Sequence, residues 1–414
     1  MEPDFRQPAD RHDARWRRTL VVMAALQGIM SLSVSVSWPF LPLYVSELGI
    51  HPITAASMWA GIITSPQFLL AAIVSPFWGA LADRVGRKAM VLRCALSMSL
   101  FTLLMGFVTD VWQLFVLSLL YGIFSGFAGA AIALVGTQVP EERLGFSLGW
   151  MATAQLAGTL IGPLVGGLLS DVLHSYRGVF YFSSTGGAIA VVLALLLVRE
   201  VRSPAEHRGA RLSTSQGHWF KGIFATRELV PMFVVLLLAQ ISASALSPIV
   251  APYARSLLGP DSQWVATAAG AAIAVTGLAG LLSSPLLGRH SDRIGYRPVL
   301  LISILGAALF TLPQAISHTI WLFIVLRSGV GIFLGGIVPT ANAWIGRLYP
   351  REQRGRVYGL TNAASSLGNF AGPLTGGIVA AHFGIPMVFI VVTVLMLLNF
   401  AWIALATRRA QAAA

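Results

Sequence analysis

The residues of this sequence that could do ionic or acid–base chemistry are few, and they gather in short stretches between apolar runs. The densest stretch is GALADRVGRK at residues 79–88, which holds one acid and three bases in a chain that is only 11% charged. It recurs as GRHSDRIGYR at 288–297, 209 residues later, with Gly, Asp, Arg, Gly and a base in matching places. Glycines permit tight turns and an aspartate can face the positive end of a helix. Each copy is therefore predicted to form a short, charged latch.

A second pair of related stretches shapes helix contacts rather than carrying charge. GTLIGPLVGG at 158–167 recurs as GNFAGPLTGG at 368–377. Glycines four residues apart lie on one helix face and let another helix come close, and a proline inside a helix bends it. Ordinary membrane packing is the alternative to a bendable, functional contact. The predicted helix-bend residues are Gly158, Gly162, Pro163, Gly166, Gly167, Gly372, Pro373 and Gly376.

Polar side chains inside the apolar runs are candidates for binding a substrate. Arg327 is the most prominent, because a guanidinium within a span is costly and normally faces a cavity or a partner. Snorkelling from a helix end is the alternative. Each polar candidate alone could make an interhelical hydrogen bond, but together they indicate a mostly apolar pocket for amphipathic ligands. The candidate substrate-binding residues are Gln27, Ser31, Trp38, Tyr121, Gln240, Ser244 and Arg327.

Membrane-spanning helices must position these residues. The sequence has 414 residues, of which 56% are hydrophobic, and its mean hydropathy is +0.75. It contains twelve apolar runs of about 20 residues, the length that spans a bilayer. Because matching stretches lie 209 or 210 residues apart, we predict an all-α integral membrane protein with two pseudo-symmetric six-helix bundles. The expected segments are an N-terminal arm (1–18), a first bundle (19–199), a linker (200–228), a second bundle (229–407) and a tail (408–414).

Charge and cysteine usage exclude several classes of function. The net charge is +12, and most Lys and Arg residues lie in the arm, the linker, the tail and alternate loops. The positive-inside rule then places both termini in the cytoplasm, so the charge reflects topology and no nucleic-acid partner is expected. The single cysteine, Cys94, allows no intrachain disulfide or cysteine-based metal site. The sequence has no GxxxxGK[ST] loop and no visible catalytic constellation, so we expect no enzyme activity and no metal.

The sequence resembles the major facilitator superfamily, and within it the twelve-helix drug:proton antiporters. Residues 79–88 resemble the superfamily's signature between helices 2 and 3, and 158–167 resembles the fifth-helix signature of antiporters. WPFLPLYVSELG (38–49), MWAGI (58–62) and VGTQVP (135–140) are most similar to bacterial multidrug efflux proteins of the MdtG type, beside the tetracycline exporters. The resemblance implies the major facilitator fold and a carrier in the bacterial inner membrane that exports small amphipathic compounds by alternating access. It also implies exchange for protons, with the proton gradient as energy source and no cofactor, and we expect a monomer.

The same resemblance gives the charged stretches a role. In the superfamily this loop locks the two halves on the cytoplasmic side, and its aspartate meets the start of the eleventh helix, which is REQRGRVYG (351–359) in this chain. By the repeat, Asp292 would meet the start of the fifth helix near EERLG (141–145). A solvated turn that only keeps charge in the cytoplasm is the alternative. The expected latch residues are Gly79, Asp83, Arg84, Gly86, Arg87, Lys88, Gly288, Asp292, Arg293, Gly295, Arg354 and Arg356.

Proton coupling has no obvious titrating group in this sequence. RSGVG (327–331) resembles the superfamily's fourth-helix signature, moved into the tenth helix, while the matching place in the fourth helix is Ser118 and carries no base. No acid or histidine falls clearly in the middle of a predicted helix, although proton-coupled carriers commonly use one there. Asp83 is therefore the leading candidate for proton coupling. The alternative function is a facilitator or exchanger for a specific metabolite, such as a sugar or an organic anion drawn by Arg327, without proton coupling.

Overall fold

The computed structural model describes residues 7–198, 229–259, 261–348 and 351–411, and they form helices joined by short turns. The first half contains α1 (Gln7–Ser37), η1 (Trp38–Phe40), α2 (Leu41–Glu47), α3 (Ile53–Val85), α4 (Arg87–Phe107), α5 (Val111–Phe124), α6 (Phe127–Gln138), α7 (Glu141–Leu173) and α8 (Tyr176–Leu197). The second half contains α10 (Leu229–Ala245), α11 (Val250–Leu258), α12 (Val265–Ile294), α13 (Tyr296–Thr311), η3 (Leu312–Ile316), α14 (Ile320–Leu348), α15 (Arg351–Phe383) and α16 (Ile385–Gln411).

The long helices match the predicted membrane spans. Eleven helical segments of the described residues are long and apolar enough to cross a membrane. The remaining long helix, α15, has 33 residues but carries more polar side chains, among them Thr361, Asn362 and Asn369. With α15, the described chain has the twelve long helical segments that the apolar runs predicted. Helix is the form such runs take in a bilayer, because it satisfies every backbone N–H and C=O away from water.

Three spans of the described chain are broken between two α-helices. The first passes from α1 through η1 to α2, the seventh passes from α10 to α11 through a turn at 246–249, and the fourth breaks between α5 and α6. At that last break Gly126 has a φ of +108°, a conformation that glycine adopts without steric strain. The backbone groups freed there lie within a span, so they need partners from neighbouring helices.

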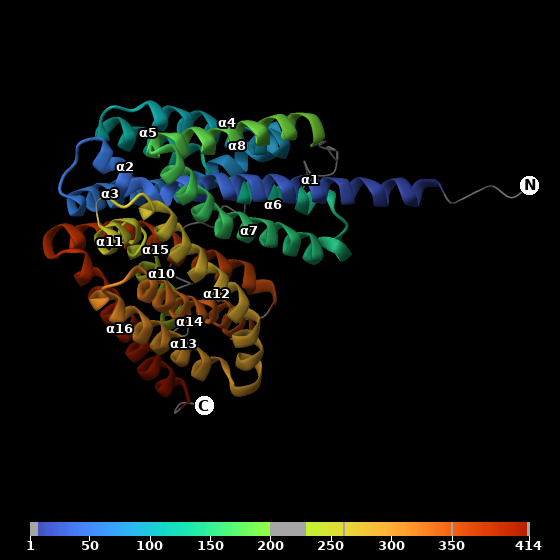
Figure 1. Ribbon diagram of the computed structural model, residues 1–414. Helices are drawn as coiled ribbons and strands as arrows, with labels where there is room; N and C mark the ends of the chain where they lie inside the picture. Colours follow the sequence, from blue (N-terminus) through green and yellow to red (C-terminus); the bar gives the residue numbers. More distant parts are fainter. Residues whose placement is uncertain (1–6, 199–228, 260, 349–350, 412–414) are drawn as a thin grey trace, which may run out of the picture.

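The two halves of the chain form two helical bundles (Figure 1), and several hydrogen bonds within them occur in both. In the first bundle the Tyr44 hydroxyl donates to the Met105 carbonyl at 2.8 Å. In the second bundle the Tyr253 hydroxyl donates to the Gln314 carbonyl at 2.6 Å. Both partners in the second bond lie 209 residues after those in the first, the offset of the sequence repeat. The repeat therefore extends to side chains outside the motifs that revealed it.

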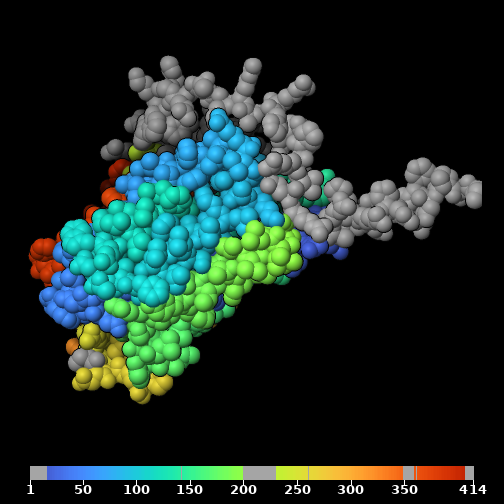
Figure 2. Space-filling model, turned by 90° about the horizontal axis from the view of Figure 1, so that it is seen from above, coloured from blue at the N-terminus to red at the C-terminus, as the bar shows by residue number. Residues whose placement is uncertain are grey.

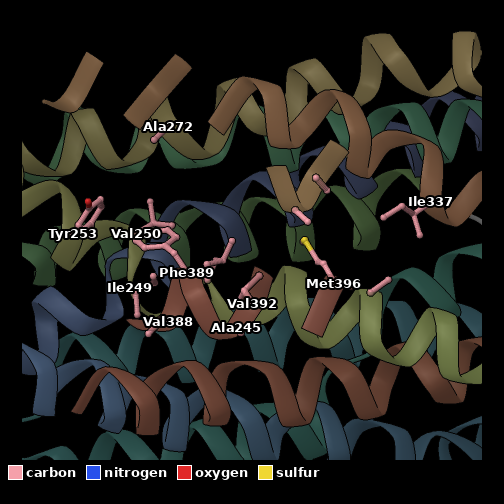
Figure 3. Packing of buried hydrophobic residues seen from close by; sticks show 14 of the residues in the cluster. Ala245, Ile249, Val250, Tyr253, Ala272, Ile337, Val388, Phe389, Val392 and Met396 are labelled. Carbon is pink, nitrogen blue, oxygen red and sulfur yellow. The ribbon is translucent and has the colours of Figure 1, made fainter. Parts of the chain in front are cut away.

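The bundles meet along two pairs of helices, α3 with α15 and α7 with α12. The second bundle has an apolar core, part of which Figure 3 shows around Tyr253, Phe389 and Met396. Phe40 and Leu43, which come from the first span, are buried in the same cluster. This apolar packing joins the two bundles at the end of the molecule where α2 and α11 lie together.

The outer face of the first bundle is apolar. Figure 2 shows this face, with α4 and α5 in blue to cyan and α8 in green. Leu96, Trp112 and Val192 on these helices are 58%, 60% and 52% exposed. An apolar surface of this extent would be unusual in a soluble monomer, whereas in a bilayer it contacts the lipid tails.

Tight glycine packing inside the bundle gives a test of the fold. A methyl group at Gly122 on α5 would lie 2.6 Å from the Cα of Gln67 on α3. We expect Gly122→Ala to push α3 and α5 apart and to lower the free energy of unfolding by about 1–3 kcal/mol, as overpacking does. Thermal unfolding of the detergent-solubilised protein, followed by circular dichroism, measures the change.

Gly129→Ala is the matched control, because no described atom lies within 4 Å of a methyl group at that position on α6. The control gains helix propensity without a clash, so its midpoint should equal or exceed that of the wild type. Equal melting of the two variants would contradict the packing argument.

Candidate functional site

A cavity of about 580 Å³ lies between the two bundles. The first bundle lines it with parts of α1, η1 and α3 to α7, and the second bundle contributes Ser244, Ser247, Ile273, Asn369 and Pro373. Among the described residues that line it there is no carboxylate, histidine or basic side chain, and its polar groups are chiefly hydroxyls and amides. Such walls suit a ligand that has a large apolar surface and a few hydrogen-bonding groups.

Most of the candidate substrate-binding residues line this cavity. They are Gln27, Ser31, Trp38, Tyr121 and Ser244. The rings of Trp38 and Tyr121 lie with their centroids 5.7 Å apart, so together they form an aromatic part of the wall. Gln27 and Ser31 lie one turn apart on α1, with Gln27 Nε2 3.5 Å from Ser31 Oγ. The helical spacing of these polar residues thus does place them on the face of α1 that borders the cavity.

Gln240 lies beside the cavity rather than in its lining. Its Nε2 donates to Asn369 Oδ1 at 2.8 Å and to Ser244 Oγ at 3.2 Å. The Ser244 hydroxyl also donates to Asn369 Oδ1 at 2.8 Å. This network ties α10 to α15 and fixes the positions of the two groups that do line the cavity, Ser244 and Asn369.

Arg327 is buried in α14 and does not belong to the cavity lining. It is 7% exposed, whereas a snorkelling arginine keeps its head group in water. Its Nε has no hydrogen-bond partner among the described atoms. Ser118 occupies the matching place in the first bundle, where its hydroxyl donates to the Ile63 carbonyl at 2.6 Å. The repeat thus holds a buried cation in one bundle and a neutral helix-to-helix bond in the other.

Gln67 on α3 is a cavity residue that the sequence analysis did not single out. It is 7% exposed, and its Oε1 has no hydrogen-bond partner among the described atoms, as is also true of Gln27 Oε1. A buried polar atom without a partner costs about 1–3 kcal/mol, so a ligand that donates a hydrogen bond would relieve this cost. The sequence feature that could have identified Gln67 is its position directly after Pro66, as an amide inside the second apolar run.

Side chains from neighbouring helices hold the break in the fourth span. Three of them donate to the carbonyls at the end of α5: Arg93 to Ser125 (3.2 Å), Ser97 to Phe124 (3.1 Å) and Trp78 to Ile123 (2.7 Å). The Arg93 guanidinium also lies over the Trp78 ring, 3.7 Å from its centroid, a cation–π contact. A cation at a helix C-terminus opposes the negative end of the helix dipole. Because Ser125 and Gly126 line the cavity, this cap fixes part of the cavity wall.

At one end of the molecule, which we call the closed end, glycines bring backbones of opposite bundles together. The contacts, each of which a methyl group would obstruct, are Gly61 with Pro373, Gly270 with Pro163, Gly167 with Ala266 and Gly377 with Ser57. The first two contacts are related by the repeat, and so are the last two. The predicted helix-bend residues Pro163, Gly167 and Pro373 therefore lie at the junction of the two bundles.

The other helix-bend residues pack within their own bundles. On α7, Gly158, Gly162 and Gly166 pack against α1. On α15, Gly372 and Gly376 pack against α10. Both α7 and α15 remain helical through their prolines. The motif thus has two faces, one that holds the helix to its own bundle and one that meets the opposite bundle.

Asp171, near the end of α7, adds a charged contact at the closed end. Its carboxylate accepts from the backbone N–H of Ala266 at 3.2 Å and from that of Thr267 at 2.6 Å, in the first turn of α12. A carboxylate at a helix N-terminus satisfies free N–H groups and opposes the helix dipole. Because α7 and α12 belong to different bundles, this contact helps to hold the closed end shut.

The repeated charged stretches lie at the opposite end, which we call the basic end. Gly86 and Gly295 connect α3 to α4 and α12 to α13 with φ values of +109° and +96°, so these two turns require glycine. Gly79 and Gly288 instead lie inside α3 and α12, with open space beside them. They do not take part in the turns, because the two helices continue for several residues beyond them.

Bases of the two stretches donate to carbonyls within their own bundles. Lys88 Nζ donates to the Leu195 carbonyl at 3.0 Å, and Arg297 Nη2 donates to the Ala404 carbonyl at 3.1 Å, again 209 residues apart. Arg87 likewise donates to a carbonyl of α6. Basic side chains near the ends of helices stabilise the last carbonyls, so these contacts strengthen each bundle separately.

The remaining latch residues either are exposed or have side chains outside the described part of the chain. Asp83 and Arg84 are exposed in the last turn of α3, and Arg293 is exposed in the last turn of α12. The side chains of Arg354 and Arg356 lie outside the described residues. A contact between Asp83 and the start of α15 therefore stays a prediction.

Asp292 has partners within its own bundle in this conformation. It lies 3.7 Å from Arg347 and accepts from the Tyr296 hydroxyl at 3.1 Å. An exposed ion pair of this kind contributes about 0–1 kcal/mol, so it can be exchanged for another partner at small cost. The predicted contact of Asp292 with the start of α7 remains a prediction for a state in which the basic end is closed.

Comparison with protein families agrees with this geometry. The family model described as Major Facilitator Superfamily matches residues 23–261 and 232–414, and these matches together span nearly the whole chain. The chain belongs to the major facilitator superfamily. Two relatives are both named multidrug resistance protein MdtG. That of Escherichia fergusonii is 34% identical over 97% of this chain and 98% of its own length, and that of Serratia proteamaculans is 37% identical over 94% and 93%.

Solved structures share the major facilitator fold. A bacterial homologue of the human lysosomal transporter Spinster, in an inward-facing and unoccupied conformation, aligns with a TM-score of 0.78 at 14% identity over 95% of this chain and 97% of that one. The nucleoside transporter NupG aligns with a TM-score of 0.78 at 16% identity, over 93% and 98%. The predicted fold, an all-α membrane protein of two six-helix repeats, is confirmed.

Membership of the major facilitator superfamily explains the position of the cavity. Transporters of this fold place the substrate site between their two repeats and expose it to each side in turn, as the repeats rock against each other. The cavity of this chain lies in that place. At the closed end, the glycine contacts between the bundles hold its walls together. The chain is a transporter and not an enzyme.

The contact made by Asp171 predicts a shift between the two states of this major facilitator protein. Asp171→Asn keeps the shape of the side chain but removes the charge at the start of α12. Charged contacts of this kind contribute about 1–2 kcal/mol. Without this contact, the population of molecules in which the closed end has opened should rise about tenfold. Spin labels at Gln113→Cys and Thr319→Cys, exposed positions on different bundles, report the distance by double electron–electron resonance after Cys94→Ser.

Asp261→Asn is the matched control, because Asp261 is exposed in the loop just before α12 and its replacement removes the same charge from the same end. The control should leave the distance distribution unchanged. If both variants shift the distances alike, net charge at this end and not the contact with α12 governs the closure.

Proposed function

We propose that this chain is a secondary active transporter that exports small amphipathic compounds across the bacterial inner membrane, in exchange for protons. The central cavity is the observation that carries the proposal. Its walls are largely apolar and carry amide and hydroxyl groups from both bundles, and the bundles pack tightly at its closed end. Such a site binds by shape and apolar contact more than by directed hydrogen bonds.

The relatives support export of drugs rather than uptake of one nutrient. Both MdtG proteins are named multidrug resistance proteins, and the similarity runs over nearly the full length of either chain. The described lining of the cavity also holds no charged group that could pair with an organic anion. Arg327, the candidate for attracting an anion, lies outside that lining.

The proposed topology places the basic end and both termini in the cytoplasm. Exposed bases gather at this end, including Arg84, Arg289 and Arg293, as the positive-inside rule expects of cytoplasmic loops. In this orientation the closed end is periplasmic and the cavity faces the cytoplasm. Both repeats belong to one chain and together line the cavity, so we propose a monomer, with no cofactor besides the proton gradient.

Proton exchange is proposed to use an acid outside the cavity. The described cavity lining holds no carboxylate, so a proton cannot compete with the compound for an acid in that wall. Asp83 is the candidate because it lies exposed in the last turn of α3, at the basic end. The same absence makes an uncoupled facilitator the competing function, and the experiment below separates the two.

Everted membrane vesicles test export and coupling together. Respiration acidifies the vesicles, acridine orange reports the pH gradient, and ethidium represents amphipathic cations in a wider panel of compounds. Coupled export predicts that each transported compound enters the vesicles and releases protons, and that Asp83→Asn abolishes both. Asp261→Asn, which removes an exposed acid at the other end, should leave both unchanged.

Uptake of compounds without proton release would replace antiport by facilitation. Absence of uptake across the panel, together with unchanged compound susceptibility of cells with and without the gene, would contradict export of amphipathic compounds altogether. Full activity of Asp83→Asn would remove Asp83 from both the latch and the coupling step.

Gln67 provides a test of where the compounds bind. Gln67→Leu removes a buried amide oxygen that has no partner in the described structure. Compounds that donate a hydrogen bond should then bind about tenfold more weakly, which corresponds to about 1.4 kcal/mol, while compounds without a donor should be unaffected. Concentration dependence of uptake into the same vesicles measures the effect. Gln113→Leu is the control, because Gln113 is exposed at the closed end and accepts from Thr109; an equal effect of both variants would exclude a direct contact.

A further inference from the structure

A second and larger hollow of the described chain lies on the outside of the first bundle. Its volume is about 1100 Å³, and it is lined by α1, α7 and α8 and by no residue of the central cavity. In Figure 1, α1 runs between α8 and α7. We call this hollow the α1 groove. Buried side chains on the other face of α1, such as Met23 and Leu26, separate it from the interior of the bundle.

The α1 groove opens toward the surrounding lipid. Among its lining residues, Val21, Phe146, Trp150 and Ile189 are 67%, 57%, 53% and 51% exposed. The lining of α1 extends from Trp16 to Ser33, which at 1.5 Å per residue is a length of about 25 Å. One leaflet of a bilayer has about 15 Å of hydrocarbon, so an acyl chain of that leaflet can lie along the groove.

Two arginines mark one end of the α1 groove. Arg17 lies near the start of the described part of α1 and Arg143 lies in the first turn of α7, and both line the hollow. Both helices begin at the basic end, so the two guanidinium groups belong to the same end of the groove. Trp16 is the neighbouring aromatic, with the Arg17 Cζ 5.6 Å from its ring centroid, and tryptophan is enriched at the level of the lipid head groups.

Charge, and not the apolar lining, decides what occupies the groove. Lipid tails in the bilayer are as apolar as the lining, so a chain gains little by moving from one to the other. An anionic head group gains the attraction of two arginines, whereas a cationic amphipathic compound is repelled by them. We propose that the α1 groove binds an anionic phospholipid of the cytoplasmic leaflet, with its phosphate at Arg17 and Arg143 and an acyl chain along α1. The site rests on the proposed topology, because that topology places the arginine end in the cytoplasmic leaflet.

Native mass spectrometry tests the site on the full chain. The protein is equilibrated in detergent with equal amounts of phosphatidylglycerol and phosphatidylcholine that carry identical acyl chains, and the retained lipids are counted. Each basic residue near an anionic head group contributes enough to predict a preference of about 30-fold for phosphatidylglycerol from two arginines. The double variant Arg17→Gln/Arg143→Gln should lose this preference.

The double variant Arg18→Gln/Arg289→Gln is the matched control. It removes the same net charge from exposed positions that do not line the groove, and Arg18 adjoins Arg17. It should keep the 30-fold preference. Ala25→Phe should reduce retention of both lipids, because Ala25 is an exposed lining residue whose replacement fills the groove.

Two results would overturn the proposal. One is an equal loss of preference in both double variants, which would assign the effect to general surface charge. The other is displacement of phosphatidylglycerol by ethidium from the wild type but not from Ala25→Phe, which would make the groove an entry path for transported compounds. Both measurements need neither a gradient nor transport, so failure of the lipid site is distinguishable from failure of the proposed export.

Discussion

Close approach of helix backbones at glycines is the constraint on which the rest of the structure depends. Lipid tails are as apolar as leucine, so helices in a bilayer associate by packing and hydrogen bonding rather than by escape from water. The two bundles meet where Gly61 packs on Pro373 and Gly270 packs on Pro163. These contacts shut one end and leave the cavity beyond them. These contacts involve backbone and small side chains, whereas Phe40 and Leu43 at the same end are large apolar groups that opening of this end would also have to separate from the second bundle.

The hydrogen bonds divide into those that hold a bundle together and those that must break when the bundles move. Tyr44 with Met105 and Lys88 with Leu195 belong to the first kind, and each has its counterpart in the second bundle. The bond from Asp171 to the start of α12 belongs to the second kind. A carrier of this fold needs rigid repeats and an exchangeable interface. The repeated bonds within each bundle make the repeats rigid, and the bond of Asp171 belongs to the exchangeable interface.

The sequence predicted those features that the two repeats share as identical residues. It did not predict contacts that depend on how each helix is rotated about its axis. The membrane spans followed from hydropathy, and the turns at Gly86 and Gly295 followed from the matching residues of the repeat. Whether Gln240 lines the cavity or supports Asn369 from behind depends on packing that a single helix does not encode. Arg93 was missed because its partner is the carbonyl of Ser125 at the end of α5. The sequence there is one continuous apolar run and gives no sign that a helix ends. Asp171 was not among the candidate residues, because its partner is a backbone N–H 95 residues away along the chain.

The acids that contact the other bundle, or are predicted to contact it, lie outside the described lining of the cavity. Asp171 engages a helix N-terminus at the closed end, while Asp83 is exposed at the basic end. In the opposite state the rocking of the bundles would reverse these environments, with Asp171 exposed and Asp83 facing the start of α15. Loss of either contact would weaken one closed state and leave the other unchanged. The contacts that decide between the two states thus lie outside the described cavity lining, so the wall that meets the compound stays free of charge.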